Sequence, residues 1–341
     1  MKWTELDWKA LDRLRDQFLR GGTATGPYWQ SPVELAHYDL TYGERIGWKW
    51  DAVLRELRIR GWKPNTRQIL DWGCGSGSAS RRVLATFGMD HFNELLVWDH
   101  SPLATDFAAE AAEQAFPRVH VSAVTPGFLA SNAPIGLLVI SHVLNELPVE
   151  ALAELRRTIL RATAVLWVEP GTHDVARGLQ TIRDELREEF QVVAPCTHQN
   201  CCGLLAEGRE RDWCHFFAPP PSEIFANPDW VKFGQRAGID LRSLPYCFLA
   251  LERKNDQAAR PAIGPTPELS RVIGRPELFK PYARLLNCDA TGVAELTLQK
   301  REDLALYKEL DRTKEPLVYR WRRDGARLFG GELLAKAEPR A

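Results

Sequence analysis

The feature that most constrains the fold of this chain is a glycine loop between a short apolar segment and a helical one. Gln68–Asp71 has the composition of a buried strand, and the loop Gly73-Cys74-Gly75-Ser76-Gly77 leads into a helical segment from about Ser78 to Phe87. A helix N-terminus presents backbone N–H groups, and glycines let a ligand approach the backbone closely. The segment therefore predicts a small-molecule site at the end of a buried strand.

The rest of the chain alternates in the same way. Apolar strands separated by amphipathic helices imply a parallel sheet that is covered on both faces. We therefore expect an α/β chain with a doubly wound, Rossmann-like sheet. The expected strands cover residues 94–99, 120–124, 137–141, 164–169, 190–195 and 247–253, and the helices cover about 102–115, 149–162 and 174–190.

Changes in composition suggest how the domains are arranged. Residues 1–66 read as a helical region, with one helix over about 4–20 and a second from Pro32 onward. The Rossmann-like domain is expected over 67–255, with a cysteine-rich insert at 194–222. A Pro- and Ala-rich linker (256–269) precedes a small β-rich domain over 270–330, in which 283–301 predicts two strands around an Asp-Ala-Thr-Gly turn.

The glycine spacing distinguishes between two kinds of ligand. Dinucleotide-binding loops have G-x-G-x-x-G, but the last position here is Ser78. An acidic residue two positions before the first glycine fits the S-adenosylmethionine arrangement better, and a second acid, Asp99, ends the next strand, where it can accept the ribose hydroxyls. The alternative for Asp99 is a plain helix cap before Ser101. This spacing indicates the class I methyltransferase type of the Rossmann-like fold. The expected ligand residues are Asp71, Gly73, Gly75, Gly77, Asp99 and Ser141.

The segment after the fourth strand supplies candidates for catalysis. Side chains at the carboxyl end of such a strand face the ligand crevice, so His142, Asn145 and Glu146 could touch the methyl donor or the acceptor. Asn145 and Glu146 could equally cap the helix that follows. The N/D-P-P-Y/F tetrapeptide of adenine N-methylating enzymes is absent, so the acceptor atom stays open.

Four of the seven cysteines lie in one short stretch. Cys196, Cys201, Cys202 and Cys214 occur among His and Pro residues, in a spacing that matches neither a pair of zinc knuckles nor a C-x-x-x-C-x-x-C run. Thiolates are soft ligands that suit zinc or iron–sulfur clusters. Clustering of this kind predicts a metal or cluster site rather than separate buried cysteines.

Taken together, the motifs resemble a family: the methyltransferase-like assembly factors of the mitochondrial small ribosomal subunit and their bacterial relatives. The resemblance extends from about Tyr38 to Tyr319 and rests on ILDWGCGSGSAS, SHVLNELP, VLWVEPGT, APCTHQNCC…DWCHF and LLNCDATG. It implies a [4Fe–4S] cluster, with zinc as the alternative, and a role at the small ribosomal subunit. The cluster ligands it implies are Cys196, Cys202, Cys214 and Cys288.

The same resemblance leaves two choices among the cysteines open. Cys201 adjoins a proposed ligand, so either Cys201 or Cys202 could bind the metal. Cys247 lies inside an expected strand and is assigned to the core, although it competes with Cys288 for the fourth position. Cys74 is explained by the need for a small side chain in the glycine loop.

Charge and hydropathy limit which partners and which location we expect for this protein. The net charge is −1, but Ser270–Gly330 holds 13 Lys and Arg against 9 Asp and Glu. This excess hints at RNA contact. No apolar run of membrane-spanning length and no signal core is present, so we expect a cytoplasmic protein with neither a membrane nor a DNA partner. The basic side chains assigned to RNA phosphates are Lys300, Arg301, Arg320, Arg322 and Arg323.

Two functions follow from these features. The first is an S-adenosylmethionine-dependent methyltransferase that acts on ribosomal RNA. The second is a non-catalytic assembly factor that uses ligand and cluster structurally, which stays open because no base or nucleophile stands out. An NAD-dependent oxidoreductase is disfavoured by Ser78 at the third glycine position and by the cysteines.

Overall fold

The structure, a computed structural model, describes residues 2–19, 29–254 and 268–337, and its chain divides into two compact units. The first comprises Met1–Leu54, Pro64–Glu169 and Pro219–Leu244; the second comprises Arg55–Lys63, Pro170–Ala218 and Pro245–Ala341. Residues 256–267 of the predicted linker lie outside the described residues. In the part that is described, no helix has both the length and the apolar character needed to cross a membrane.

The first unit is built on parallel strands. They are β1 (Gln68–Trp72), β2 (Glu94–Trp98), β3 (His120–Ala123), β4 (Ile135–Ser141) and β5 (Ala162–Pro170), in the spatial order β3-β2-β1-β4-β5. The order reverses between β1 and β4, and ligands of doubly wound sheets bind at the carboxyl ends of the strands beside such a reversal. The predicted class I methyltransferase-like, Rossmann-like fold is confirmed.

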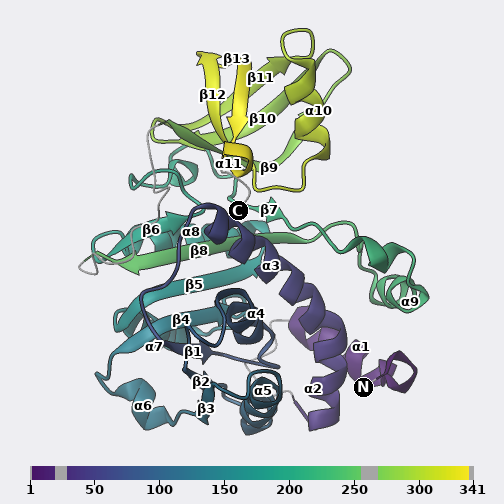
Figure 1. Cartoon of the computed structure of the whole chain (residues 1–341), viewed down its shortest axis with the longest axis vertical. Helices are drawn as coiled ribbons and strands as arrows, with labels where there is room; N and C mark the ends of the chain where they lie inside the picture. The colour runs from purple at the N-terminus through teal and green to yellow at the C-terminus, as the bar shows by residue number, and fades with distance from the viewer. Residues whose placement is uncertain (1, 20–28, 255–267, 338–341) are drawn as a thin grey trace. The chain divides into compact units, whose positions relative to one another are not determined.

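Helices in the connections cover this sheet (Figure 1). They are α4 (Ser78–Phe87), α5 (Pro102–Ala115), α6 (Pro126–Ala130) and α7 (Val149–Ile159). The bounds of α4 and α5 are those expected from sequence. Gly77 has φ +74° at the start of α4, and Pro102 stands at the first position of α5, where its missing N–H has no intrahelical partner to lose.

The N-terminal region is helical as expected, but its second helix is interrupted. After η1 (Trp3–Glu5) and α1 (Trp8–Leu19), α2 (Pro32–Tyr38) passes through a π-helical turn, η3 (Asp39–Gly43), into α3 (Glu44–Ile59). The Thr41 hydroxyl donates to the carbonyl of His37 at 2.8 Å. The sequence pattern had indicated one continuous helix, because periodicity over this length does not reveal a single wide turn. Two further elements, η5 (Ser222–Phe225) and α9 (Pro228–Ala237), belong to the same unit.

The second unit contains three strands that pair antiparallel, and a closed barrel. Among the three strands, β6 (Phe190–Ala194) and β7 (Phe216–Phe217) both pair with β8 (Pro245–Arg253). Helix α8 (His173–Glu185) precedes β6, and the cysteine-rich insert, with η4 (Gly203–Leu205), connects β6 to β7. The insert therefore begins and ends on strands of one sheet.

The barrel is the β-rich C-terminal region expected from sequence. Its strands are β9 (Leu269–Leu278), β10 (Tyr282–Asp289), β11 (Gly292–Gln299), β12 (Val318–Asp324) and β13 (Arg327–Leu333), closed in the order β10-β11-β13-β12-β9, with α10 (Leu304–Arg312) after β11 and α11 (Leu334–Ala337) at the end. Its core includes Leu285, Leu296 and Tyr319. The Asp-Ala-Thr-Gly turn joins β10 to β11 as predicted.

Candidate functional site

The glycine loop of the first unit is shaped by three glycines in left-handed conformations. Gly73, Gly75 and Gly77 have φ values of +69°, +52° and +74°. A Cβ on Gly77 would come within 3.0 Å of the Cβ of Ala108, whereas a Cβ on Gly75 would meet nothing within 4 Å. Gly77 is thus fixed by helix packing, and Gly75 faces open space where a ligand can reach the backbone.

Asp71 is the penultimate residue of β1 and lies beneath this loop. It is 1% exposed, and neither carboxylate oxygen accepts a hydrogen bond of good geometry from the described residues. Burial raises its pKa to about 6, although Ser80 lies close enough to oppose that shift. A buried carboxylate without such partners is costly in a folded protein. An amino group of a ligand would supply the missing donor, which fits the role predicted for Asp71.

Asp99 lies at the end of β2 and is tied to the glycine loop. Its Oδ2 accepts from the Gly75 N–H at 3.0 Å, and its Oδ1 accepts from the Ser101 N–H at 2.9 Å. The N-cap of α5 is Ser101, so Asp99 does not act as the plain cap that was its alternative. The carboxylate therefore lies beside the open face of Gly75.

The end of β4 carries a strained histidine. His142 has φ +55°, a conformation that costs energy in residues other than glycine and is concentrated at functional sites. Its Nε2 lies 3.0 Å from Nζ of Lys49, and its Nδ1 lies 3.3 Å from Oγ of Ser141, which accepts from the Trp50 indole at 2.9 Å. Burial, together with Lys49 and Arg45, holds the pKa of His142 well below its ordinary value. The imidazole is therefore neutral, with both nitrogens engaged.

Two carboxylates whose pKa values are raised follow the ends of β4 and β5 or lie near them. Burial, followed by Glu169 and Asp99, raises the pKa of Glu146 to about 7. Burial also raises the pKa of Glu169 to about 7, although Oε1 accepts from Trp167 Nε1 at 2.6 Å and from the Val143 and Leu144 amides. A carboxyl that titrates near neutrality suits proton transfer.

The structure also decides whether Asn145 and Glu146 cap the helix that follows β4. Asn145 is exposed, and the N-cap of α7 is Pro148, so neither Asn145 nor Glu146 caps that helix. The sequence analysis missed Lys49, Trp50 and Glu169. Glu169 is the penultimate residue of β5, as Asp71 is of β1, and this parallel was the available signal. Lys49 and Trp50 lie within a helix whose pattern gives no such sign.

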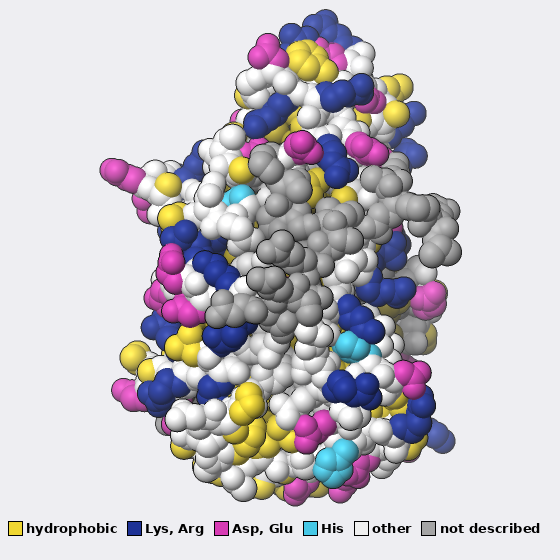
Figure 2. Space-filling view, turned by 60° about the vertical axis from the view of Figure 1, so that its left-hand side comes forward, with side chains coloured by type: hydrophobic (Ala, Val, Ile, Leu, Met, Phe, Trp, Pro, Cys, Tyr) yellow, Lys and Arg dark blue, Asp and Glu magenta, His cyan; other side chains and the backbone are white. Residues whose placement is uncertain are grey.

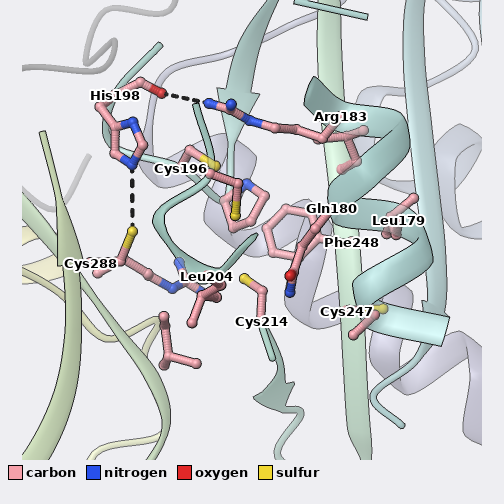
Figure 3. A pocket seen from close by; sticks show the side chains of 16 residues that line it. Leu179, Gln180, Arg183, Cys196, His198, Leu204, Cys214, Cys247, Phe248 and Cys288 are labelled. Atoms are coloured by element: carbon pink, nitrogen blue, oxygen red, sulfur yellow. Dashed lines mark hydrogen bonds between the residues drawn. The ribbon is translucent and has the colours of Figure 1, made fainter. Parts of the chain in front are cut away.

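In the second unit, the four cysteines of the predicted ligand set line one cavity of about 40 Å³ (Figure 3). They come from the insert and from β10. Burial raises the pKa of Cys202 to about 11, with Cys196 adding to the shift. Burial also raises the pKa of Cys214 well above its ordinary value, and Cys196, Cys202 and Cys288 all contribute. Negative charge on any one of these sulfurs thus opposes charge on the others.

The remaining cysteines are placed differently. Cys201 is exposed and is not among the residues that line the cavity. Cys247 lies in β8, as expected, and lines the cavity, but its Sγ approaches the carbonyl of Pro170 at 3.4 Å; Figure 3 shows it well apart from Cys288. His198, which the sequence analysis did not single out, lies with Nε2 3.4 Å from Sγ of Cys288.

Arginines from elsewhere in the unit shape the insert. One guanidinium nitrogen of Arg177 donates to the carbonyls of Leu204, Arg209 and Asp212, each at 3.0 Å. Arg60, fully buried, donates to the carbonyls of residues 193 and 195 at 3.2 and 3.1 Å. A segment without regular structure needs partners of this kind for its buried carbonyls. The cysteines are thus held by a fixed backbone.

The cavity contains thiols, but their arrangement is not that of a metal site. Among the described residues no group of three or more Cys, His, Asp or Glu side chains is arranged so that it could hold a metal ion, and the cysteines are free thiols. Four mutually interacting thiols form the donor set of iron–sulfur clusters and of structural zinc. A cation would offset the repulsion between their thiolates. The residues therefore fit such a group by their chemistry.

The basic residues predicted to contact RNA all lie in the barrel or beside it, but their environments differ. Arg323 pairs with Asp289 at 3.0 Å, and Arg320 is partly buried opposite Glu332. Arg322 and Arg301 are exposed, whereas Lys300 lies with Nζ 4.9 Å from the Tyr307 ring centre. Arg301, Arg322 and Arg323 are therefore the three exposed members of the five, and of these Arg323 is held in an ion pair.

Known structures include several to which the chain is similar. One is the magnesium protoporphyrin IX methyltransferase of Synechocystis PCC 6803 (13% identity, 72% of this chain and 95% of that chain covered, TM-score 0.39). Another is the N-methyltransferase NodS of Bradyrhizobium japonicum WM9 (14% identity, 71% and 98% covered, TM-score 0.39). No curated protein matches the chain.

A match to a family model shows to which protein family the chain belongs. The model described as mitochondrial small ribosomal subunit Rsm22 matches residues 49–314. That range includes the glycine loop, the strand ends around Asp99 and Glu146, and the four cysteines that line the cavity. The chain belongs to the Rsm22 family.

Proposed function

We propose that this protein is an S-adenosylmethionine-dependent methyltransferase that acts on RNA of the small ribosomal subunit. The observation that carries the proposal is the buried carboxylate of Asp71 beneath a glycine loop whose Gly75 faces open space. Family membership supports the choice of the small subunit as partner. Asp71, Asp99 and the loop glycines would hold the ligand, which supplies an electrophilic methyl group when bound.

Glu146 is the residue of this chain that we assign to proton transfer. It lies after β4, and its pKa of about 7 lets it accept a proton from an acceptor nitrogen or oxygen near neutral pH. His142 is less suited, because Lys49 and Ser141 engage its two nitrogens. We assign His142 and Ser141 to the wall of the ligand site, with Asn145 at its exposed margin.

We further propose that Cys196, Cys202, Cys214 and Cys288 hold a [4Fe–4S] cluster, with zinc as the alternative. The four side chains line one cavity, and Cys196 adds to the rise that burial causes in the pKa values of Cys202, Cys214 and Cys288, whereas Cys201 is exposed. Three ligands would come from the insert and one from β10, so the group would join the insert to the barrel. Such a role is structural, and it would contribute to folding free energy.

One observation favours the non-catalytic alternative, in which the protein binds its ligand and the small subunit without turnover. His142 has no unengaged nitrogen, which leaves Glu146 as the single proton acceptor suggested by the described residues at the end of β4. Transfer of labelled methyl groups to purified small-subunit RNA separates the two functions. We expect transfer by the unaltered protein and at least tenfold slower transfer by Glu146→Gln, in line with about 10²–10⁴ for general base catalysis. Ligand binding without any transfer would establish the alternative.

A further inference from the structure

The strand order of the barrel points to a fold with a known binding mode. In chain order the five strands lie as 1-2-3-5-4, and the barrel closes between β12 and β9. Strands β11 and β13 run parallel, and α10 lies between the third and fourth strands. This is the topology of the OB-fold, in which the face of strands 2 and 3 and the loops joining strands 1–2 and 4–5 bind oligonucleotides and oligosaccharides.

Part of that face is already covered in this protein. At one end of β10 and β11, Cys288, Leu286 and Val293 pack against Leu204 of the insert. A Cβ on Gly203 would come within 3.1 Å of the Val293 side chain, so the insert lies directly on the strands. A ligand of the barrel must therefore use the other end of these strands.

At that other end lie the β9–β10 turn, which joins strands 1 and 2 of the barrel, and the β12–β13 turn, which joins strands 4 and 5. The β9–β10 turn contacts the end of β11, where the Lys300 N–H donates to the carbonyl of Pro281 at 2.9 Å. The β12–β13 turn contacts the same strand, where the Thr297 N–H donates to the carbonyl of Ala326 at 2.9 Å. We call this surface, formed by residues 279–282, 299–301 and 322–329, the open end of the barrel; Figure 1 shows it with the β12–β13 turn.

Two aromatic rings stand on the open end. Phe279 is 38% exposed and stacks on Tyr282, with ring centres 4.7 Å apart and planes at 22°. Phe329 is 42% exposed, and the Arg327 guanidinium lies 5.2 Å from its ring centre. Exposed rings beside cationic groups are the platform on which proteins stack the bases of single-stranded nucleic acids.

The charge of the open end is positive. Together with the residues that flank it, the open end (277–284, 295–302 and 322–329) holds seven Lys and Arg against four Asp and Glu. Glu277 and Glu302 are occupied by ion pairs with Arg284 and Arg327. Exposed Lys280 and Arg322 form no ion pair with any described residue. Figure 2 shows Lys and Arg side chains around hydrophobic ones at the top of the barrel.

We propose that the open end of the barrel binds single-stranded RNA, with bases stacked on Phe279 and Phe329 and phosphates on Lys280, Arg301 and Arg322. The positive charge favours a polyanion over an oligosaccharide, and the rings favour unpaired bases over a duplex, whose bases are stacked inside the helix. The choice of RNA rests on the proposed function at the small subunit.

The test uses the full chain and a fluorescently labelled 12-nucleotide uridine RNA, with a duplex RNA of equal length for comparison. Anisotropy should show tighter binding of the single strand. Phe279→Ala combined with Phe329→Ala should weaken binding by roughly 25-fold or more, since each stacked base contributes at least about fivefold. Leu304→Ala, a similarly exposed apolar residue on α10, is the matched control and should have no effect.

The phosphate contacts are tested by the salt dependence of the same binding. Lys280→Ala with Arg322→Ala should reduce the slope of log affinity against log salt by about 1.4, at about 0.7 for each contact. Lys308→Ala with Arg312→Ala, on α10, is the charge-matched control. The proposal would be overturned if Phe279→Ala combined with Phe329→Ala left the RNA affinity unchanged. It would also be overturned if the unaltered protein bound the duplex as tightly as the single strand, or bound no RNA. Calorimetry with S-adenosylmethionine on the same samples tests the proposed function separately, because the ligand site lies in the other unit.

Discussion

The N–H of Gly75 donates a hydrogen bond of 3.0 Å to Oδ2 of Asp99, which links the loop after β1 to the end of β2. This bond fixes the carboxylate beside the one loop glycine at which an added Cβ would have no neighbour within 4 Å. The loop and the acid thus form one rigid unit before any ligand arrives, and a pre-organised site loses less entropy on binding.

The first prediction is that Asp99→Ala weakens S-adenosylmethionine binding about tenfold or more. The change removes a charged hydrogen-bond acceptor, which contributes about 1.5–3 kcal/mol, and it frees the glycine loop. Isothermal calorimetry measures the affinity. Asp106→Ala, an exposed acid on α5, is the control and should bind as the unaltered protein does. Equal affinity in Asp99→Ala would remove this residue from the site, and tighter binding of NAD would refute the ligand itself.

The second prediction concerns the cysteines. Protein purified without oxygen should contain iron and show a broad visible absorption band. Cys288→Ser and Cys202→Ser should each lose both, since thiolate ligation is lost. The tail after residue 268 should also become more sensitive to protease in Cys288→Ser, because the proposed link between insert and barrel is broken.

Two variants serve as internal controls for the cysteine prediction. Cys247→Ser and Cys201→Ser should keep the iron, because Cys201 is exposed and Cys247 contacts the carbonyl of Pro170. Iron loss in Cys247→Ser with retention in Cys288→Ser would reverse the assignment of the fourth ligand. One zinc per chain and no iron would retain the site but contradict the cluster.

The third prediction is a pH dependence of stability that originates at Glu169. Its pKa rises from 4.5 to about 7 on folding, so the folded state binds its proton more tightly than the unfolded state does. Stability from this group is present below pH 4.5 and is lost as the pH rises through about 7. The free energy of unfolding of Glu169→Gln, relative to that of the unaltered protein, should therefore increase from pH 5 to pH 8 by on the order of 3 kcal/mol.

Urea denaturation at the two pH values measures this change. Glu150→Gln, an exposed acid on α7, gives the baseline. Glu146 adds an effect of the same sign, because Glu169 contributes to the rise in its pKa. A difference between Glu169→Gln and the unaltered protein that stays constant with pH would show that the carboxylate ionises normally.

The fourth prediction concerns the buried ion network of the second unit. Glu56 accepts from Arg271 at 2.6 Å and from Arg60 at 2.9 Å, and all three side chains are buried. Burial alone would raise the pKa of Glu56, but the two guanidiniums outweigh it and hold the pKa below its ordinary value. Glu56→Ala leaves two buried cations without this acceptor and should destabilise the protein by about 3–5 kcal/mol.

The matched control is the exposed pair of Arg55 and Glu315 in the same unit. Arg55 is 58% exposed, so Glu315→Ala should cost only about 0–1 kcal/mol. Unfolding in guanidinium chloride measures the free energy of unfolding of the two variants. Similar losses of stability in both would mean that the buried network contributes no more than a surface pair.

Structural features that depend only on residues close together in the chain could be predicted from the sequence. The bounds of α4 and α5 follow from the loop glycines and from Pro102, and the turn between β10 and β11 follows from Asp289, whose Oδ1 accepts from the Thr291 N–H at 2.9 Å. The π-helical turn at Asp39–Gly43 was missed because a single extra residue barely disturbs the apolar periodicity around it.

The closure of the barrel was not predictable in the same way. β9 contains Gly274 and Pro276, which weaken a strand pattern, and β13 pairs with β11, which lies before α10 and β12 in the chain. Likewise, the sequence alone left Cys201 and Cys202 equivalent, and they differ in this structure because Cys202 lines the cavity while Cys201 faces solvent.

The amino-acid sequence by itself thus determined the strand–loop–helix units, the glycine loop and the fold class. These depend on backbone conformations and apolar periods that each segment carries locally. Only the tertiary structure decided that Lys49 reaches His142, that Arg271 reaches Glu56, and that a histidine lies beside Cys288. Such contacts join residues separated by 90 positions or more, and which long-range partners meet depends on the packing of the whole unit, which no local pattern specifies.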